Sequence, residues 1–171
     1  TRVGVLNILT LMGADISVLN PREIGGEPVA DLQVRYAPLH GIDIPEDEVP
    51  LAIDEFPALF IAAACASGTT TLRGASELRV KESDRIAAMA EGLDTLGIKN
   101  EPTPDGIVIE GGKLGGGSVN TFHDHRIAMA FAIAGLRASG AIEILDCDHV
   151  ATSFPGFAEL ISSAGLRLEA R

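Results

Sequence analysis

Two stretches of this chain repeat one pattern at an offset of 72 residues. Residues 54–68 read DEFPALFIAAACASG and residues 126–140 read RIAMAFAIAGLRASG. Both are apolar segments of helical length that end in Ala-Ser-Gly, and a short segment typical of a strand follows each. Equivalent helices in such a repeat point in the same direction. The repeat therefore predicts an α/β (α+β) fold built from repeated α-β units.

The rest of the chain divides around this repeat. Three further helices are expected to end in a glycine that leads into a strand, at Gly13, Gly97 and Gly165. The first helix has no preceding strand, so we expect a partial unit over 1–43, then units over 44–111 and 112–171. Helices are expected at 2–12, 52–67, 83–96, 122–139 and 154–164; strands are expected at 15–19, 29–34, 69–72, 98–101, 107–109, 142–145 and 166–168. Residues 20–22 and 25–26 are expected to form a turn.

A charged stretch, LRVKESDRI at residues 78–86, precedes the third expected helix. Ser83 is a reasonable N-cap, and a first turn near Lys81 would gather Lys81, Glu82 and Arg85 at the positive end of the helix. Free backbone N–H groups and cations at such an end form an anion site. The alternative is an ordinary solvated cap, because charged first turns are common.

The repeat would place polar and charged residues from other helix starts on the same face. Asp54, residues 124–126 and residues 152–153 would lie at N-termini equivalent to the one near Lys81. Several positive helix ends on one face would attract a polyanionic ligand. Carboxylates are poorly suited to that task, so Asp54 and Glu82 are candidates for proton transfer instead.

The charge and the composition exclude several classes of function. The net charge is −11, with one Tyr and no Trp, which argues against nucleic-acid binding and against anionic membrane surfaces. The longest apolar run, at 127–136, is too short to span a bilayer. Cys65 and Cys147 form no CxxC pair, and we expect both to be buried free thiols in a cytoplasmic protein.

Four motifs together resemble the 5-enolpyruvylshikimate-3-phosphate synthase family. These motifs are LRVKESDR at 78–85, DHRIAM at 124–129, DEFP at 54–57 and DCDHVATSFP at 146–155. They extend over most of the chain but correspond only to the C-terminal domain of that family. The resemblance implies an inside-out α/β barrel domain whose substrate cleft is completed by a missing N-terminal domain of the same enzyme.

The resemblance also implies a reaction and residue roles. The family transfers the enolpyruvyl group of phosphoenolpyruvate to the 5-hydroxyl of shikimate 3-phosphate and releases phosphate. By implication, Asp54 accepts the hydroxyl proton, Lys81 binds shikimate 3-phosphate and Glu82 protonates the methylene of phosphoenolpyruvate. Arg85 and Arg126 would clamp the carboxylate and phosphate of phosphoenolpyruvate, with His125 beside them. No metal and no cofactor is implied.

One position departs from the family pattern, and two alternative functions stay open. Thr152 stands where many members have a lysine, and a hydroxyl cannot replace that charge. The first alternative is the related transferase that acts on UDP-N-acetylglucosamine and uses a cysteine in its other domain. The second is a non-catalytic anion-binding domain with the same fold. Residues Lys81 to Arg85 favour shikimate 3-phosphate.

Overall fold

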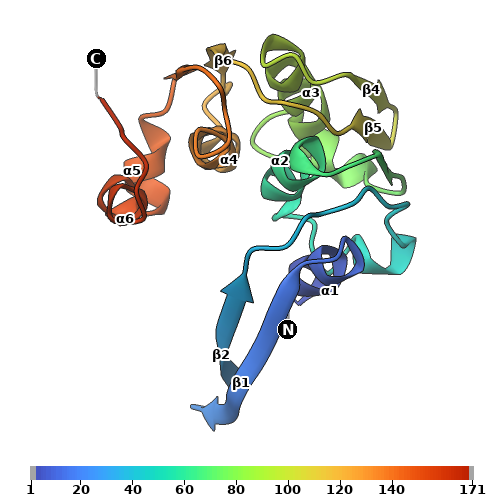
Figure 1. Cartoon of the computed structure of the whole chain (residues 1–171), viewed down its shortest axis with the longest axis vertical. Coiled ribbons are helices and arrows are strands. Elements are labelled where there is room, and N and C mark those ends of the chain that lie inside the picture. The colour runs from blue at the N-terminus through green and yellow to red at the C-terminus, as the bar shows by residue number, and fades with distance from the viewer. Residues whose placement is uncertain (1–2, 170–171) are drawn as a thin grey trace.

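The computed structural model describes residues 3–169 as a row of helices flanked by small sheets (Figure 1). The helices are α1 (Gly4–Leu11), α2 (Phe56–Cys65), α3 (Arg85–Thr95), α4 (His125–Ala134), α5 (His149–Ser153) and α6 (Phe157–Ser163), with 3₁₀ turns η1 (Glu46–Glu48) and η2 (Ser76–Val80). The strands are β1 (Asp15–Ile24), β2 (Glu27–Arg35), β3 (Thr69–Leu72), β4 (Asn100–Thr103), β5 (Gly106–Glu110), β6 (Gly117–Asn120) and β7 (Ile142–Leu145).

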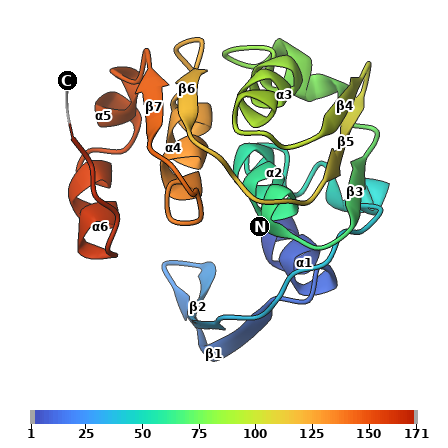
Figure 2. The same ribbon diagram turned by 45° about the horizontal axis from the view of Figure 1, so that its top comes forward.

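The sequence repeat appears as two parallel β-α-β arrangements. Strands β6 and β7 pair in parallel and α4 connects them. On the other side of the molecule, residues His40 and Asp43 form parallel bridges with Ser67 and Thr71, and α2 lies between them in the sequence. Helices α2 and α4 consequently begin on the same side of the molecule, where both start near α3 (Figure 2). The expected common orientation of the repeated helices is therefore confirmed.

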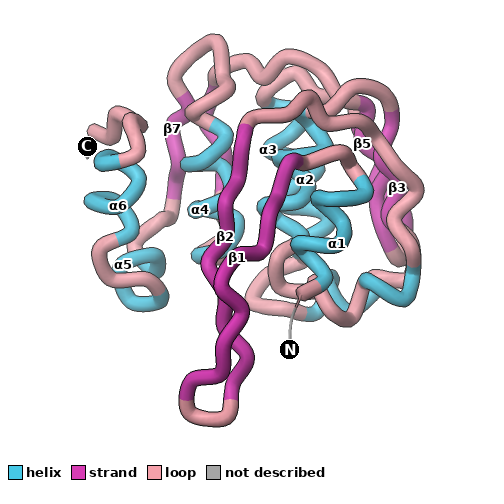
Figure 3. The backbone as a smooth tube through the Cα atoms, turned by 60° about the horizontal axis from the view of Figure 1, so that its bottom comes forward, coloured by secondary structure: helices cyan, strands magenta, loops and turns pink. Residues whose placement is uncertain are grey.

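The antiparallel strands form two separate groups. Strand β5 lies between β3 and β4, which confirms the expected hairpin around residues 104–106. Strands β1 and β2 form a long hairpin that extends away from the helices (Figure 3). Its pairs Ile16↔Val34 and Val18↔Leu32 place apolar side chains on one face, and three of these four residues are exposed.

The predicted turn at residues 20–22 is wrong. Strand β1 continues through these residues, and the register with β2 shifts between Leu19 and Arg22. Asn20 absorbs the irregularity with a left-handed φ of 49°, and its side chain donates to Asp31 at 2.9 Å. The chain reverses at Gly25 and Gly26, both of which have positive φ.

The core lies between the helices and the inner faces of the small sheets. Phe56 and Phe60 of α2 and Phe131 of α4 are almost fully buried there. Gly92 of α3 makes close packing with α4 possible, because an added Cβ would lie 2.2 Å from Cζ of Phe131. The described part of the chain contains no helix that is long and apolar enough to cross a membrane.

We expect Gly92→Ala to destabilise the fold despite the better helix propensity of alanine. The clash with the buried Phe131 ring should lower the free energy of unfolding by about 1–3 kcal/mol, which exceeds the roughly 1 kcal/mol that alanine gains in a helix. Urea unfolding measures this difference. Phe131→Leu should relieve the clash, so the double variant should lose less than the sum of the two single losses. Strict additivity would contradict the packing argument.

Three further expectations about local structure are wrong near the C-terminus. Residues 149–153 form the short helix α5, so Thr152 and Ser153 lie in its last turn and not at a helix start. Helix α6 begins later, at Phe157, after Gly156 with a φ of 83°. Residues 166–168 form no strand, because Leu166 packs on the small cluster around Phe157 and Ile161 instead of pairing with a neighbour.

Cys65 is half-buried and Cys147 is exposed, so the expectation of two buried thiols is wrong for Cys147. Burial raises the pKa of the Cys65 thiol above its ordinary value, although the charge of Arg137 acts against this shift. Neither cysteine forms a disulfide.

Candidate active site

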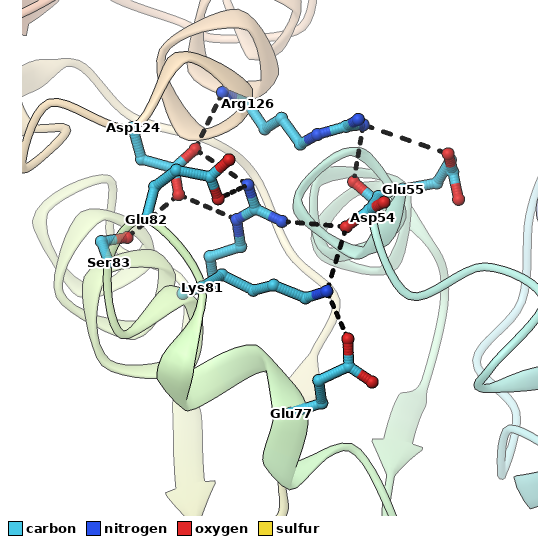
Figure 4. Close-up of polar contacts among 9 residues, drawn as sticks. Asp54, Glu55, Glu77, Lys81, Glu82, Ser83, Asp124 and Arg126 are labelled. Carbon is cyan, nitrogen blue, oxygen red and sulfur yellow. Dashed lines mark hydrogen bonds and ion pairs between the residues drawn. The ribbon is translucent and has the colours of Figure 1, made fainter.

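Six of the residues singled out in the sequence lie at the starts of three different helices. Asp54 precedes α2, Lys81 and Glu82 connect η2 to α3, and Arg85 is the first residue of α3. His125 and Arg126 open α4. The side chains of Asp54 and Lys81 point toward each other, and that of Glu82 points toward the guanidinium group of Arg85 (Figure 4). The expected convergence of these helix starts is therefore confirmed.

The centre of this cluster is the guanidinium group of Arg85, whose side chain is 1% exposed. Its Nε donates to Oδ2 of Asp124 at 2.8 Å, and Nη2 donates to Oε2 of Glu82 at 2.6 Å. Its Nη1 lies 3.4 Å from Oδ1 of Asp54. Three carboxylates from three segments therefore share one buried cation.

Asp124 connects the starts of α3 and α4. Its side chain is fully buried, and Oδ1 accepts from the backbone N–H of Arg126 at 2.9 Å, which caps α4. Its Oδ2 also accepts from the Ser83 hydroxyl at 3.1 Å. Burial alone would raise the pKa of Asp124, but the bonds and charge of Arg85, with these two further donors, hold that pKa below its ordinary value.

Lys81 lies at the edge of the cluster between two carboxylates. Its Nζ donates to Oε1 of Glu77 and lies 3.5 Å from Oδ1 of Asp54. The hydrogen bond to Glu77 and the charges of both carboxylates hold the pKa of the Lys81 ammonium above its ordinary value, although partial burial acts against this shift. Lys81 therefore stays protonated at neutral pH, with its ammonium directed at Asp54.

Arg126 completes the cluster from α4. Its Nη1 donates to the backbone carbonyl of Asp54 at 3.1 Å and lies 4.0 Å from Oε1 of Glu55. Arg126 and Asp54 are separated by the 72-residue period, so this bond joins equivalent positions of the repeat. The Arg126 side chain is 35% exposed and leaves part of its fork open to solvent. His125 is half-buried beside it.

The local details differ from the sequence prediction in three ways. Helix α3 is capped by Asp84, whose Oδ1 accepts from Ala87 N–H at 3.0 Å, whereas Ser83 binds Asp124. Lys81 and Glu82 lie before the helix and not in its first turn. Aspartates cap both α3 and α4, and each accepts from one of the backbone N–H groups that were expected to bind an anion.

Sequence reasoning missed two acidic partners of the cluster. Glu77 lies one helical turn before Lys81, and this spacing is a signal that could have identified the pair. Glu55 follows Asp54 directly, and its Oε2 is buried without a hydrogen-bond partner among the described residues. No sequence pattern distinguishes Glu55 from a solvent-exposed helix-start acid.

The cluster combines strong anion-binding groups with a surplus of negative charge. Five carboxylates (Asp54, Glu55, Glu77, Glu82 and Asp124) face three cations (Lys81, Arg85 and Arg126), which leaves a formal charge of −2. Two arginine forks are suited to carboxylate and phosphate oxygens, and the partly exposed carboxylates are suited to moving protons. Among residues 3–169 no group of three or more His, Cys, Asp or Glu side chains could hold a metal ion.

This fold is shared with enolpyruvyl transferases. The enolpyruvyl transferase NikO from Streptomyces tendae has a TM-score of 0.66 to this chain, with 18% identity over 97% of this chain and 36% of that one. An EPSP synthase from Acinetobacter baumannii is much more similar, with a TM-score of 0.96 and 59% identity over 98% of this chain and 40% of that one. The chain therefore has the enolpyruvyl transferase fold.

The family assignment comes from the sequence comparisons. The profile of the EPSP synthase (3-phosphoshikimate 1-carboxyvinyltransferase) family matches residues 1–161. The 3-phosphoshikimate 1-carboxyvinyltransferase of Methylococcus capsulatus is 68% identical over 99% of this chain, and that of Coxiella burnetii is 59% identical over 99%. This chain belongs to the EPSP synthase family. It spans 39% of the length of each of these two relatives.

Proposed function

We propose that this chain forms most of the C-terminal domain of a two-domain enzyme that transfers the enolpyruvyl group of phosphoenolpyruvate to the 5-hydroxyl of shikimate 3-phosphate. The observation that carries the proposal is the convergence of Asp54, Lys81, Glu82 and Arg85 in a chain with this family membership. The enzyme would work in the cytoplasm, in the pathway to aromatic amino acids, and would need no metal or organic cofactor.

The proposed reaction is an addition followed by an elimination. In the addition, the 5-oxygen bonds to C2 of phosphoenolpyruvate, its proton passes to Asp54, and Glu82 delivers a proton to C3. In the elimination, C3 returns a proton to Glu82, the C2–C3 double bond forms again, and the C2–O bond to phosphate breaks. The phosphate leaves with the proton held by Asp54. Two carboxylates in different surroundings suit these separate tasks.

The proposed binding roles follow the positions of the cations. Lys81 points its ammonium at Asp54, 3.5 Å away, so it can hold the hydroxyl-bearing substrate beside the proton acceptor. Arg85 and Arg126 would bind the carboxylate and phosphate of phosphoenolpyruvate, with His125 next to them. Arg85 enters this role only after at least one of its three carboxylate contacts is released.

We also propose the domain division of the sequence: a partial unit over 1–43, then units over 44–111 and 112–171. The hairpin β1–β2 supports it, because this hairpin follows helix α1 as β4–β5 follows α3. Strand β5 of that second hairpin pairs with β3, whereas β1 and β2 pair only with each other in the described chain. The strand that would pair with this first hairpin, as β3 pairs with β5, would come from the remainder of a longer protein.

Two alternatives predict different ligands. A UDP-N-acetylglucosamine enolpyruvyl transferase would bind the nucleotide sugar in preference to shikimate 3-phosphate. A non-catalytic anion-binding domain would bind phosphorylated ligands without turnover. The Lys81–Asp54 pair favours the proposed enzyme over the non-catalytic alternative, because it places a possible base beside an ammonium group. The family match favours it over the sister transferase.

A chimera tests the proposed function directly. This chain would replace the matching 39% of the Methylococcus capsulatus relative, with which it shares 68% identity. We expect the chimera to release phosphate from phosphoenolpyruvate only when shikimate 3-phosphate is present. The 171-residue chain alone is the matched control, and we expect it to show little turnover because it would supply only one side of the cleft.

Two outcomes would contradict the proposal. A folded chimera that binds UDP-N-acetylglucosamine selectively would support the sister transferase. A folded chimera that binds both proposed substrates but produces no phosphate would support the non-catalytic alternative.

A further inference from the structure

The contact between Glu82 and Arg85 conflicts with the roles that the proposed reaction gives to these two residues. The Glu82 carboxylate accepts a 2.6 Å hydrogen bond from Arg85, whose guanidinium group is always charged. The proposed reaction, however, requires Glu82 to deliver a proton to carbon. The same Arg85 donor is also needed for the incoming anionic substrate.

We propose that phosphoenolpyruvate, when it binds to Arg85, displaces the Glu82 carboxylate. The displaced carboxylate then takes up the proton used in the reaction, so that Glu82 acts as a proton switch controlled by the substrate. This inference rests on the proposed function. It assigns Arg85 a second role beyond binding, because Arg85 then controls when Glu82 holds a proton.

Burial decides which carboxylate is displaced. The Asp124 side chain is 0% exposed and accepts hydrogen bonds from Arg85, Ser83 and the Arg126 backbone. Removing it would leave buried donors unsatisfied and uncap α4. The Glu82 side chain is 51% exposed, lies before α3 and is paired with Arg85 in the cluster. Glu82 is therefore the partner that can swing away at least cost.

Asp54 is a less suitable partner to displace. It contacts Nη1 of Arg85 at 3.4 Å, but it also contacts Lys81 at 3.5 Å, so it keeps a cationic neighbour after the substrate arrives. Within residues 3–169, Glu82 forms its ion pair with Arg85, the cation that the substrate takes over. Once the substrate has taken Arg85, this ion pair is lost.

The charge of the site acts in the same direction. The cluster carries a formal charge of −2 before any ligand binds, with Asp54, Asp124 and Glu55 around the arginines and Glu77 on Lys81. Phosphoenolpyruvate adds two further anionic groups. A like charge nearby disfavours ionisation of a carboxyl group. Proton uptake by the one displaced carboxylate relieves this repulsion, and it produces the acid that the addition step needs.

Calorimetric titration of phosphoenolpyruvate into the chimera tests the switch. Shikimate 3-phosphate is left out so that no turnover occurs, and the titration is repeated at about pH 8 in buffers of different ionisation enthalpy, where the phosphate of the ligand carries no proton. We expect net proton uptake on ligand binding, and this uptake should increase as the pH of the titration is lowered. Glu82→Gln should bind the ligand at least as tightly and take up no proton.

Asp43→Asn is the matched control, because it removes an acid that pairs with an arginine, Arg73, but lies outside the cluster. Its proton uptake should equal that of the unmodified chimera. Binding without proton uptake, or the same uptake in Glu82→Gln, would overturn the switch and leave the proposed function standing. Failure of the unmodified, folded chimera to bind phosphoenolpyruvate would overturn both.

Discussion

Asp54→Asn is expected to lower the turnover number of the chimera by about 10²–10⁴-fold, which is the usual contribution of a positioned general base. Asparagine preserves the size of the side chain and the backbone carbonyl that accepts from Arg126. It removes the carboxylate that accepts the proton, together with the negative charge that faces Lys81 and Arg85. The loss should therefore appear mainly in kcat, while KM for phosphoenolpyruvate changes little.

Asp43→Asn provides the control for this substitution. Asp43 is also paired with an arginine, Arg73, at 3.9 Å, but its side chain is 77% exposed and lies outside the cluster. Its kinetics should match those of the unmodified chimera. Circular dichroism would establish that both variants are folded, and a folded Asp54→Asn variant with full turnover would remove Asp54 from the mechanism.

The second large effect concerns stability and falls on Asp124. Asp124→Ala would leave the buried Arg85 guanidinium without its closest fully buried partner, and removing one member of a buried ion pair typically costs about 3–5 kcal/mol. We expect a loss of this size in the free energy of unfolding of the chain, measured by urea denaturation. The enzyme would also lose activity, because both arginines of the cluster depend on Asp124 for their positions.

Asp84→Ala is the matched comparison for Asp124→Ala. Both aspartates cap a helix and bind an arginine, but the Asp84 side chain is 38% exposed and its partner is Arg79. Loss of an exposed cap should cost only about 1 kcal/mol. Equal losses in the two variants would show that burial of the Arg85–Asp124 pair contributes nothing beyond helix capping.

The depressed pKa of Asp124 also predicts a pH dependence. A carboxyl whose pKa is lower in the folded state stabilises the fold above its unfolded pKa, and this stabilisation is lost as pH falls through the folded value. The unmodified chain should therefore lose stability below about pH 4. Asp124→Asn should show a smaller change over the same range, since it has no proton to bind.

The sequence alone determined the repeating pattern of the chain. Apolar periodicity located α1, α2, α3 and α4, and β-branched or alternating segments located β3 and β7. These predictions succeeded because they depend on local spacing within one element. The predicted strand at 166–168 failed because a strand needs a partner, and a partner is not a local property.

The motifs likewise identified the residues of the candidate site but not their contacts. LRVKESDR and DHRIAM located Lys81, Glu82, Arg85 and Arg126. The Asp124 carboxylate forms its ion pair with Arg85, whereas its neighbour Arg126 contributes only a backbone N–H to it. Arg85 and Asp124 are 39 positions apart in the sequence, and only the packing of α3 against α4 brings them together.

The sequence by itself therefore determined which elements form, how they repeat, and which acids and bases stand at the helix starts. Only the tertiary structure decided that Arg85 is enclosed by Asp54, Glu82 and Asp124, and that Glu77 holds Lys81. The physical reason is distance. Spacing along the chain fixes which side chains share a helix face, whereas a charge interaction depends on separation and burial in space, and both are set only when the helices pack together.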